Sequence, residues 1–417
     1  MHSRRLFLSS LGGAVYGARA AASTRGLAPL LAAAGNGEAY WRLVKEQFAL
    51  RPGTAPMNAA NLCPSPRAVA EKVTELTRDL DGDVSFQNRE KFNATLEESR
   101  RKVAEMLGVS PEELALVRNT SEGNNAVNSG VALKAGDEVV LFDQNHPTNN
   151  VAWDVRAARY GFSVKRVAVP LTAASPEEIF RLFEAALTPR TRLLSITQVS
   201  NSSGVRLPAR EICEMARRRG IYTHVDGAQT WGALQVNLRG MGCDSYAASA
   251  HKWFMGPKEA GVLYVRGERI AELWPLIVAP GWGNKAQTEA KGARKFETLG
   301  QRDDACLAAV GTAADFHRMI GHERVEARVL ELATALKEGL AKIRGVKLNT
   351  SMDPRLSAGV VTARIEGAEP RKVYETIYKR HGIGGATVGG LRLCPHVYNT
   401  LEDVERAARA VAEAMAA

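Results

Sequence analysis

The chain has 417 residues, of which 45% are hydrophobic and 24% charged, so it is long enough for about two domains. No apolar run is long enough to predict a membrane span with confidence. The formal charge is +10, but four of the arginines precede residue 26, and the other basic residues are dispersed rather than interleaved with aromatic ones. A nucleic-acid-binding protein is therefore a weak alternative.

The N-terminus has the layout of an export signal. Arg4 and Arg5 precede an apolar stretch rich in alanine and glycine, and no acidic residue occurs before Glu38. This order predicts a twin-arginine signal over residues 1–34, which the translocation machinery would read and which would be removed from a periplasmic protein. A basic, disordered N-terminus is the alternative interpretation.

Helical patterns follow at residues 38–50, 66–80 and 93–107. From there short β-rich runs alternate with helices such as 175–187 and 208–220, an order that predicts an α/β fold with a mostly parallel sheet. The runs are 114–117, 138–142, 163–169, 192–197, 221–226 and 260–266. Residue 303 begins a second unit, with two helices through residue 343, a strand at 358–367, and further helices and a strand after it.

Four parts are therefore expected. They are the signal (1–34), an N-terminal helix and connector (35–65), a large cofactor-binding domain (66–300) and a smaller C-terminal α+β domain (301–417). The five cysteines include no C-x-x-C pair, so the sequence favours neither a metal site nor a redox centre. They are Cys63, Cys213, Cys243, Cys306 and Cys394.

The stretch "SYAASAHKWFMGPK" (245–258) places a lysine, Lys252, at what reads as the end of a strand. Polar residues follow the other predicted strands too, and ligand sites in such sheets gather at the carboxyl ends of the strands. These residues are Thr120, Ser121, His146, Asn201, Asp226, Gln229, Ser249 and His251.

These residue types suit pyridoxal 5′-phosphate. Lys252 can form a Schiff base with the aldehyde, and Asp226 can pair with the pyridine nitrogen. His146 can lie flat against the ring. A phosphate needs hydroxyls and backbone N–H groups at a helix N-terminus. The candidates for this role are Thr120, Ser121, Ser249 and His251. Taken singly, Thr120 and Ser121 are better explained as a helix cap, Asp226 as a turn residue, and His146 as a structural or surface side chain.

The motifs "NTSEGN", "DGAQ", "SAHK" and "RLCPHVYNT" occur in an order that resembles the class V aminotransferase family of fold-type I pyridoxal-phosphate enzymes. The resemblance is greatest to the branch with cysteine desulfurases and isopenicillin N epimerase. It implies that Gln229 and Asn201 hydrogen-bond the cofactor's phenolic oxygen and that Arg392 holds the substrate α-carboxylate. It also implies a homodimer, with the site built across a two-fold interface.

Two positions depart from that family. Cysteine desulfurases carry a catalytic cysteine on the loop that corresponds to residues 381–390, and here this loop contains none. Sulfur transfer through a persulfide is therefore not expected. Gln301 stands where the family has a threonine in a loop that reaches the neighbouring subunit's phosphate, so that contact is in doubt.

The expected activity is chemistry at the α-carbon of an amino acid or peptide-like metabolite, with transamination first. Epimerisation and β-elimination or C–S cleavage share the same opening steps and stay open as alternatives. A degenerate, non-enzymatic binding protein is the remaining class, against which the presence of Lys252, Asp226 and Arg392 argues.

Overall fold

The computed structural model describes residues 24–35, 37–278 and 290–416. The twin-arginine motif at residues 4 and 5 lies outside these residues. A seven-stranded sheet forms the centre, in which β8 alone runs antiparallel to its neighbours. In spatial order the strands are β2 (Leu114–Val117), β8 (Gly261–Val265), β7 (Ser245–Ser249), β6 (Tyr222–Asp226), β5 (Thr191–Thr197), β3 (Glu138–Phe142) and β4 (Ser163–Val167).

Helices cover both faces of this sheet, which explains why most of its strands are buried along their whole length. Alternate residues of β3 join different cores, with Val140 and Phe142 on one side and Val139 and Leu141 on the other. The second face carries α7 (Thr120–Gly130) and α8 (Pro147–Tyr160). The first carries α6 (Lys91–Leu107), α9 (Pro176–Ala186), α10 (Ala209–Arg218) and α12 (Asp304–Ile320).

The C-terminal part builds its own core around a three-stranded antiparallel sheet in the order β12-β10-β9. The connector before the large sheet joins this part, because β1 (Ala55–Pro56) pairs with β11 (Ile383–Gly384). The elements are β9 (Val346–Leu348), β10 (Val361–Ile365), β12 (Leu391–Leu393), α13 (His322–Ala341), α14 (Pro370–His381) and α15 (Leu401–Ala416).

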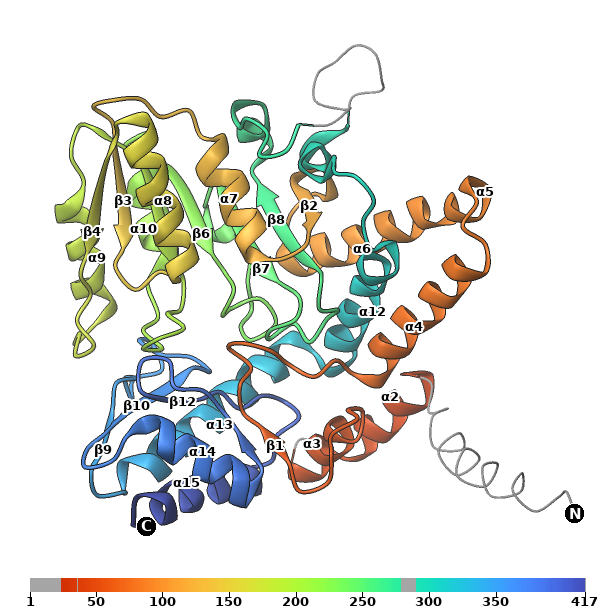
Figure 1. Ribbon diagram of the computed structural model, residues 1–417, viewed down its shortest axis with the longest axis vertical. Coiled ribbons are helices and arrows are strands. Elements are labelled where there is room, and N and C mark those ends of the chain that lie inside the picture. Colours follow the sequence, from red (N-terminus) through yellow and green to blue (C-terminus); the bar gives the residue numbers. More distant parts are fainter. Residues whose placement is uncertain (1–23, 36, 279–289, 417) are drawn as a thin grey trace, which may run out of the picture.

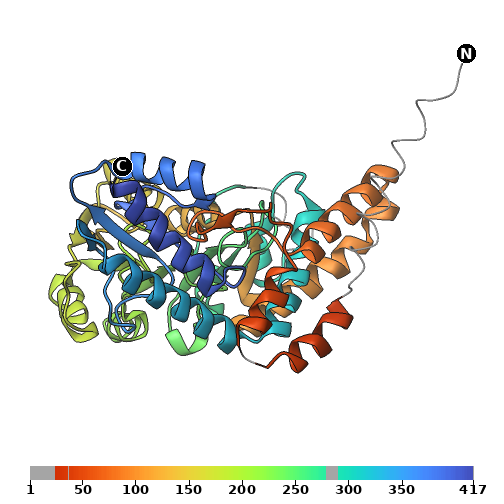
Figure 2. The same ribbon diagram turned by 90° about the horizontal axis from the view of Figure 1, so that it is seen from below.

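At the N-terminus, α2 (Thr24–Ala33) lies beside α3 (Glu38–Lys45), and Leu27 and Leu31 are buried in one core with Tyr40 and Trp41. Part of the segment expected to be removed therefore packs against the protein. A hairpin of α4 (Arg67–Gly82), α5 (Phe86–Arg89) and α6 extends from one end of the molecule (Figure 2). Within the described residues, no helix combines the length and apolarity needed to cross a membrane.

The predicted elements agree closely with this structure. The runs at 114–117 and 138–142 are β2 and β3 residue for residue. The helix predicted over 38–50 ends at Lys45, because the next residues turn so that Phe48 can bridge to Pro66. The parallel strands β3, β5, β6 and β7 bring their carboxyl ends to one edge of the sheet, where the loops carrying the candidate residues meet.

Candidate active site

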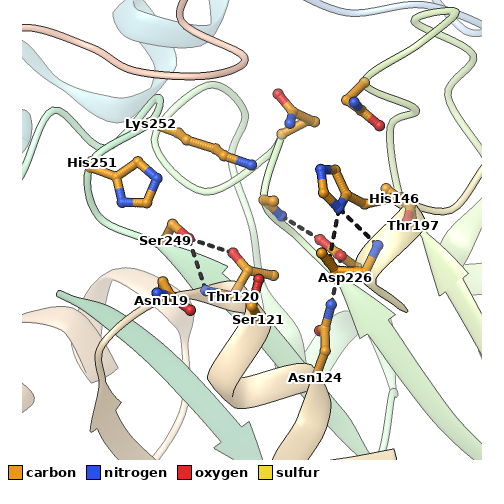
Figure 3. Close-up of a pocket in the computed structure, with 14 residues that line it drawn as sticks. Asn119, Thr120, Ser121, Asn124, His146, Thr197, Asp226, Ser249, His251 and Lys252 are labelled. Carbon is orange, nitrogen blue, oxygen red and sulfur yellow. Dashed lines mark hydrogen bonds between the residues drawn. The ribbon is translucent and has the colours of Figure 1, made fainter. Parts of the chain in front are cut away.

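The N-terminus of α7 forms one wall of a cavity at this edge (Figure 3). Asn119 caps the helix by accepting a hydrogen bond from the backbone nitrogen of Glu122 at 3.0 Å. Ser249, at the end of β7, accepts a hydrogen bond from the Thr120 backbone nitrogen at 2.8 Å, and the two hydroxyls lie 2.6 Å apart. Ser121 and His251 line the same cavity. Hydroxyls and free N–H groups at a helix N-terminus are suited to an anion.

Asp226 ends β6 and is almost fully buried. One carboxylate oxygen accepts from Asn124 Nδ2 at 2.8 Å, and the other accepts from the backbone nitrogen of Ala228 at 3.0 Å. Both donors are neutral, so they hold the carboxylate without cancelling its charge. The same carboxylate lines the cavity, where it can pair with a cationic N–H group.

Lys252 lines the opposite wall, three residues after β7. Burial lowers the pKa of its ammonium, and the positive charge of Arg392 adds to that effect while the negative charge of Asp226 opposes it. The negative charge of Asp226 does not reverse this lowering of the pKa. Lys252 therefore gives up its proton more readily than a solvated lysine does. A neutral amine is the form that can act as a nucleophile or a base.

The backbone after Lys252 is clamped. Met255 adopts a left-handed conformation with φ 55°, and its nitrogen donates to the Lys252 carbonyl oxygen at 2.8 Å. The next two carbonyl oxygens accept from His396 Nε2 at 2.7 Å and from His317 Nε2 at 3.0 Å. Burial lowers the pKa of His396 to about 4 and that of His317 to about 3, so both histidines are neutral donors at ordinary pH.

His146 follows β3 and caps α8. Its Nδ1 accepts a hydrogen bond from the backbone nitrogen of Thr148 at 3.3 Å and lies 2.8 Å from the Thr148 hydroxyl. Burial and the nearby Lys252 lower its pKa. The ring is therefore neutral with its proton on Nε2, a form that can lie against another ring without carrying charge into the cavity.

Arg392, on β12, approaches from the C-terminal part but is not among the residues that line the cavity. Its Nη1 donates to the Asn201 carbonyl oxygen at 2.9 Å and its Nη2 to Asn58 Oδ1 at 3.1 Å. The buried Nε has no hydrogen-bond partner among the described residues. Its charge acts on both Lys252 and His146, so it lies near the same site.

Gln229 lines the cavity with an amide that is already engaged. Its Nε2 donates to the Ala60 carbonyl oxygen at 3.1 Å, and its Oε1 accepts from Trp253 Nε1 at 2.8 Å. One amide hydrogen of Gln229 remains for a ligand. Gln301 lies away from this cavity, exposed, and accepts from Arg89 Nη2 at 2.7 Å.

The structure thus brings nine of the ten predicted residues around one cavity of about 190 Å³, with Arg392 beside it. Five further lining residues were not predicted, and they are Asn119, Asn124, Thr148, Thr197 and Ala228. Asn124 lies one turn after Thr120 on α7, so the helical repeat alone could have predicted that both residues face the same side. Nothing in the sequence around Thr197 distinguished it from an ordinary strand residue.

These groups fit pyridoxal 5′-phosphate. An anion cradle, a buried carboxylate, a flat neutral histidine and a lysine of lowered pKa surround one space, and the buried Thr197 hydroxyl facing it has no partner among the described residues. Thr120, Ser121, Ser249 and His251 would hold the phosphate, Asp226 the ring nitrogen, and Lys252 the aldehyde carbon. The described residues contain no group of three or more His, Cys, Asp or Glu side chains placed to hold a metal ion.

Known proteins share this sequence and fold. The chain is 34% identical to isopenicillin N epimerase of Amycolatopsis lactamdurans, over 89% of this chain and 98% of that protein. It is 27% identical to a probable cysteine desulfurase of Methanothermobacter thermautotrophicus, over 84% and 92% of the two chains. A solved structure of mutant C-DES, with glycine covalently linked to its pyridoxal-phosphate cofactor, superposes with a TM-score of 0.82 at 23% identity, over 88% and 99% of the two chains.

A model of the family described as aminotransferase class V matches residues 58–411, which include every residue that lines the cavity. The cofactor of this family is the one that the cavity fits. The chain belongs to the class V aminotransferases, which depend on pyridoxal 5′-phosphate.

Proposed function

We propose that the enzyme exchanges a proton at the α-carbon of an amino acid or peptide-like metabolite that carries a free α-carboxylate. One observation carries this proposal: Lys252 and Asp226 line one cavity, and Arg392 lies near enough for its charge to act on the Lys252 amine. Bound pyridoxal 5′-phosphate supplies an electron sink for the negative charge that develops on the α-carbon.

The residues divide the work. The Lys252 amine, of lowered pKa, removes the α-proton. A proton returned to the same face restores the substrate, and a proton delivered to the opposite face inverts the α-carbon. Asp226, held by Asn124 and Ala228, keeps a ring nitrogen protonated. Arg392 presents a planar guanidinium, and this group orients the substrate carboxylate.

Among the possible outcomes we place epimerisation first, because the relative with the name isopenicillin N epimerase is similar over 98% of its length. Transamination, which the sequence favoured, stays as the second candidate because the matching family is described by that activity. A persulfide route is disfavoured, since all five cysteines are buried and none lies on the loop at residues 381–390.

Incubation in deuterated water separates these outcomes. The purified enzyme would be given a panel of L- and D-amino acids and short peptides, each followed by mass spectrometry, chiral chromatography and the absorption of the cofactor. Deuterium incorporation with inversion supports epimerisation, and release of a keto acid with conversion of the cofactor to its amine form supports transamination. No exchange in any substrate, with Lys252→Ala indistinguishable from wild type, would contradict the proposal.

We further propose a periplasmic homodimer that leaves the cytoplasm through the twin-arginine pathway. Arg4 and Arg5 before the apolar stretch support the pathway, and membership of the family supports the dimer. Cell fractionation of wild type against the double Arg4→Lys, Arg5→Lys variant tests the first point. Sedimentation of the purified protein tests the second.

A further inference from the structure

A line of buried polar side chains runs from Asp226 into the interior, behind the cavity. Asn124, His224 and Ser245 belong to it, and each is at most 2% exposed. His224 and Asp226 lie two residues apart on β6 and so face the same side, on which α7 places Asn124. Ser245 stands directly beside His224 in the register of β6 and β7. In the proposed function, the only role of these three residues is the hydrogen bond from Asn124 to Asp226.

The hydrogen bonds along this line have one consistent direction. An ionised carboxylate only accepts, so Asn124 must turn its Nδ2 toward Asp226, as it does at 2.8 Å. Its Oδ1 then faces His224 Nε2 at 2.9 Å and can only accept, so the His224 proton lies on Nε2. His224 Nδ1 is left as an acceptor for the Ser245 hydroxyl, 2.8 Å away.

Each member of the line therefore fixes the next. Without the Nε2–H donor of His224, the Asn124 amide could rotate and present its oxygen to Asp226, which would repel the carboxylate. Burial lowers the pKa of His224 to about 3, so the imidazole does not charge at ordinary pH and its donor pattern does not change. The second anchor of Asp226, the Ala228 nitrogen, is backbone and is independent of this line.

We propose that Asn124 and His224 are positioning residues, which hold the Asp226 carboxylate aimed at the cavity through a one-directional chain of hydrogen bonds from Ser245. The inference rests on the proposed function, since Asp226 matters to the reaction only if it pairs with a ring nitrogen. Asn124 lines the cavity and His224 lies behind it, but in this scheme both act on the reaction only through Asp226. Their loss should therefore lower the rate of proton exchange and leave substrate binding almost unchanged.

The chain offers a matched control. Asn128 follows Asn124 by one turn of α7, is 3% exposed, and has no hydrogen-bond partner for its amide among the described residues. Asn124→Leu and Asn128→Leu thus make the same change at the same depth in the same helix. We expect Asn124→Leu to lower kcat for α-proton exchange about 10- to 100-fold with KM within a factor of about two, as for the loss of a hydrogen bond to a charged group. Asn128→Leu should match wild type.

His224 is tested by a pair of variants. Gln can still donate to Asn124 Oδ1, so His224→Gln should keep most of the rate that His224→Leu loses. The absorption of the bound cofactor should shift in its pH dependence for Asn124→Leu and His224→Leu, but not for Asn128→Leu. Equal rates and spectra for Asn124→Leu and Asn128→Leu would overturn the inference.

A readout without cofactor separates the inference from the proposed function. In ¹⁵N-histidine-labelled apoenzyme, the resonance that His224→Gln removes should show the Nε2–H tautomer and stay neutral from pH 8 down to about 5, as its lowered pKa requires. Asn124→Leu should change that tautomer or its exchange. Nδ1–H in wild type would contradict the chain of bonds. Wild type that binds no cofactor would instead contradict the proposed function and leave the tautomer result standing.

Discussion

The Ser249 hydroxyl lies 2.6 Å from the hydroxyl of Thr120 and 2.8 Å from its backbone nitrogen, and so joins two segments 129 residues apart. This contact ties the end of β7, which leads to Lys252, to the first turn of α7. The strand that carries the amine and the helix that would carry the phosphate are thereby held at a fixed separation.

Ser249→Ala should weaken cofactor binding about tenfold, the cost of a hydrogen bond whose backbone donor is left without this acceptor. Titration of apoenzyme with pyridoxal 5′-phosphate measures the change. Ser99→Ala is the control, because Ser99 is equally buried and accepts from the Gly311 nitrogen at 3.0 Å in another part of the fold. Equal affinities for the two variants would argue against a phosphate cradle at α7.

Arg392→Lys should raise KM for substrates with an α-carboxylate about 10- to 100-fold, since lysine cannot form the planar, two-bond contact of a guanidinium. For an amine substrate that lacks the carboxylate, KM should rise much less. Arg328→Lys provides the comparison, because Arg328 is as deeply buried but bonds the Asn399 carbonyl oxygen. Steady-state kinetics with matched substrates decides, and a uniform loss for both substrates would reject the carboxylate role.

The cysteines should be unreactive in the folded enzyme. All five are buried, and burial raises the thiol pKa of each, to about 12 for Cys63 and Cys213. A thiol reagent should therefore label none of them at pH 7 and all five in denaturant. A cysteine that reacts rapidly in the native state, or a persulfide found after incubation with cysteine, would reopen the desulfurase route.

The buried Lys252 side chain should lower the stability of the folded apoenzyme. Its folded pKa lies below 10.5, so between that lowered value and 10.5 the unfolded chain binds more protons than the native one. Stability then rises with pH across this window. Lys252→Met should accordingly raise the melting temperature of the apoenzyme at pH 7, with a gain that shrinks toward pH 10. A gain that is constant with pH would show that burial of the ammonium is not its cause.

The strands were predictable where sequence and burial agree. β2 and β3 are short apolar runs that the sheet buries on both faces, so pattern and structure coincide. β7 reads "SYAAS", whose small residues have little strand preference. In the sequence, only the SAHK motif indicated where β7 ends. The residues 24–33 fit the end of a signal and the helix α2 equally well, because alanine and leucine suit both.

The site was predictable in its loops and not in its interior. Lys252, Asp226 and Ser249 each follow or end a strand, and the rule about carboxyl ends of parallel strands brought them together. His224 and Asn124 contact each other across 100 residues, and an asparagine inside a helix gives no sign of its partner. The rotation of α7 on the sheet decides which polar side chains meet in this core. The pattern of residues in the sequence does not predict that rotation.

The clamped backbone after Lys252 has a consequence for timing. Lys252 would hold the cofactor, and its carbonyl oxygen and the next two accept hydrogen bonds from Met255, His396 and His317. Only the four-carbon arm of the lysine is then free to swing, and side-chain rotations take picoseconds to nanoseconds. The amine can therefore change position by side-chain rotation alone, and its motion need not wait for a loop to close.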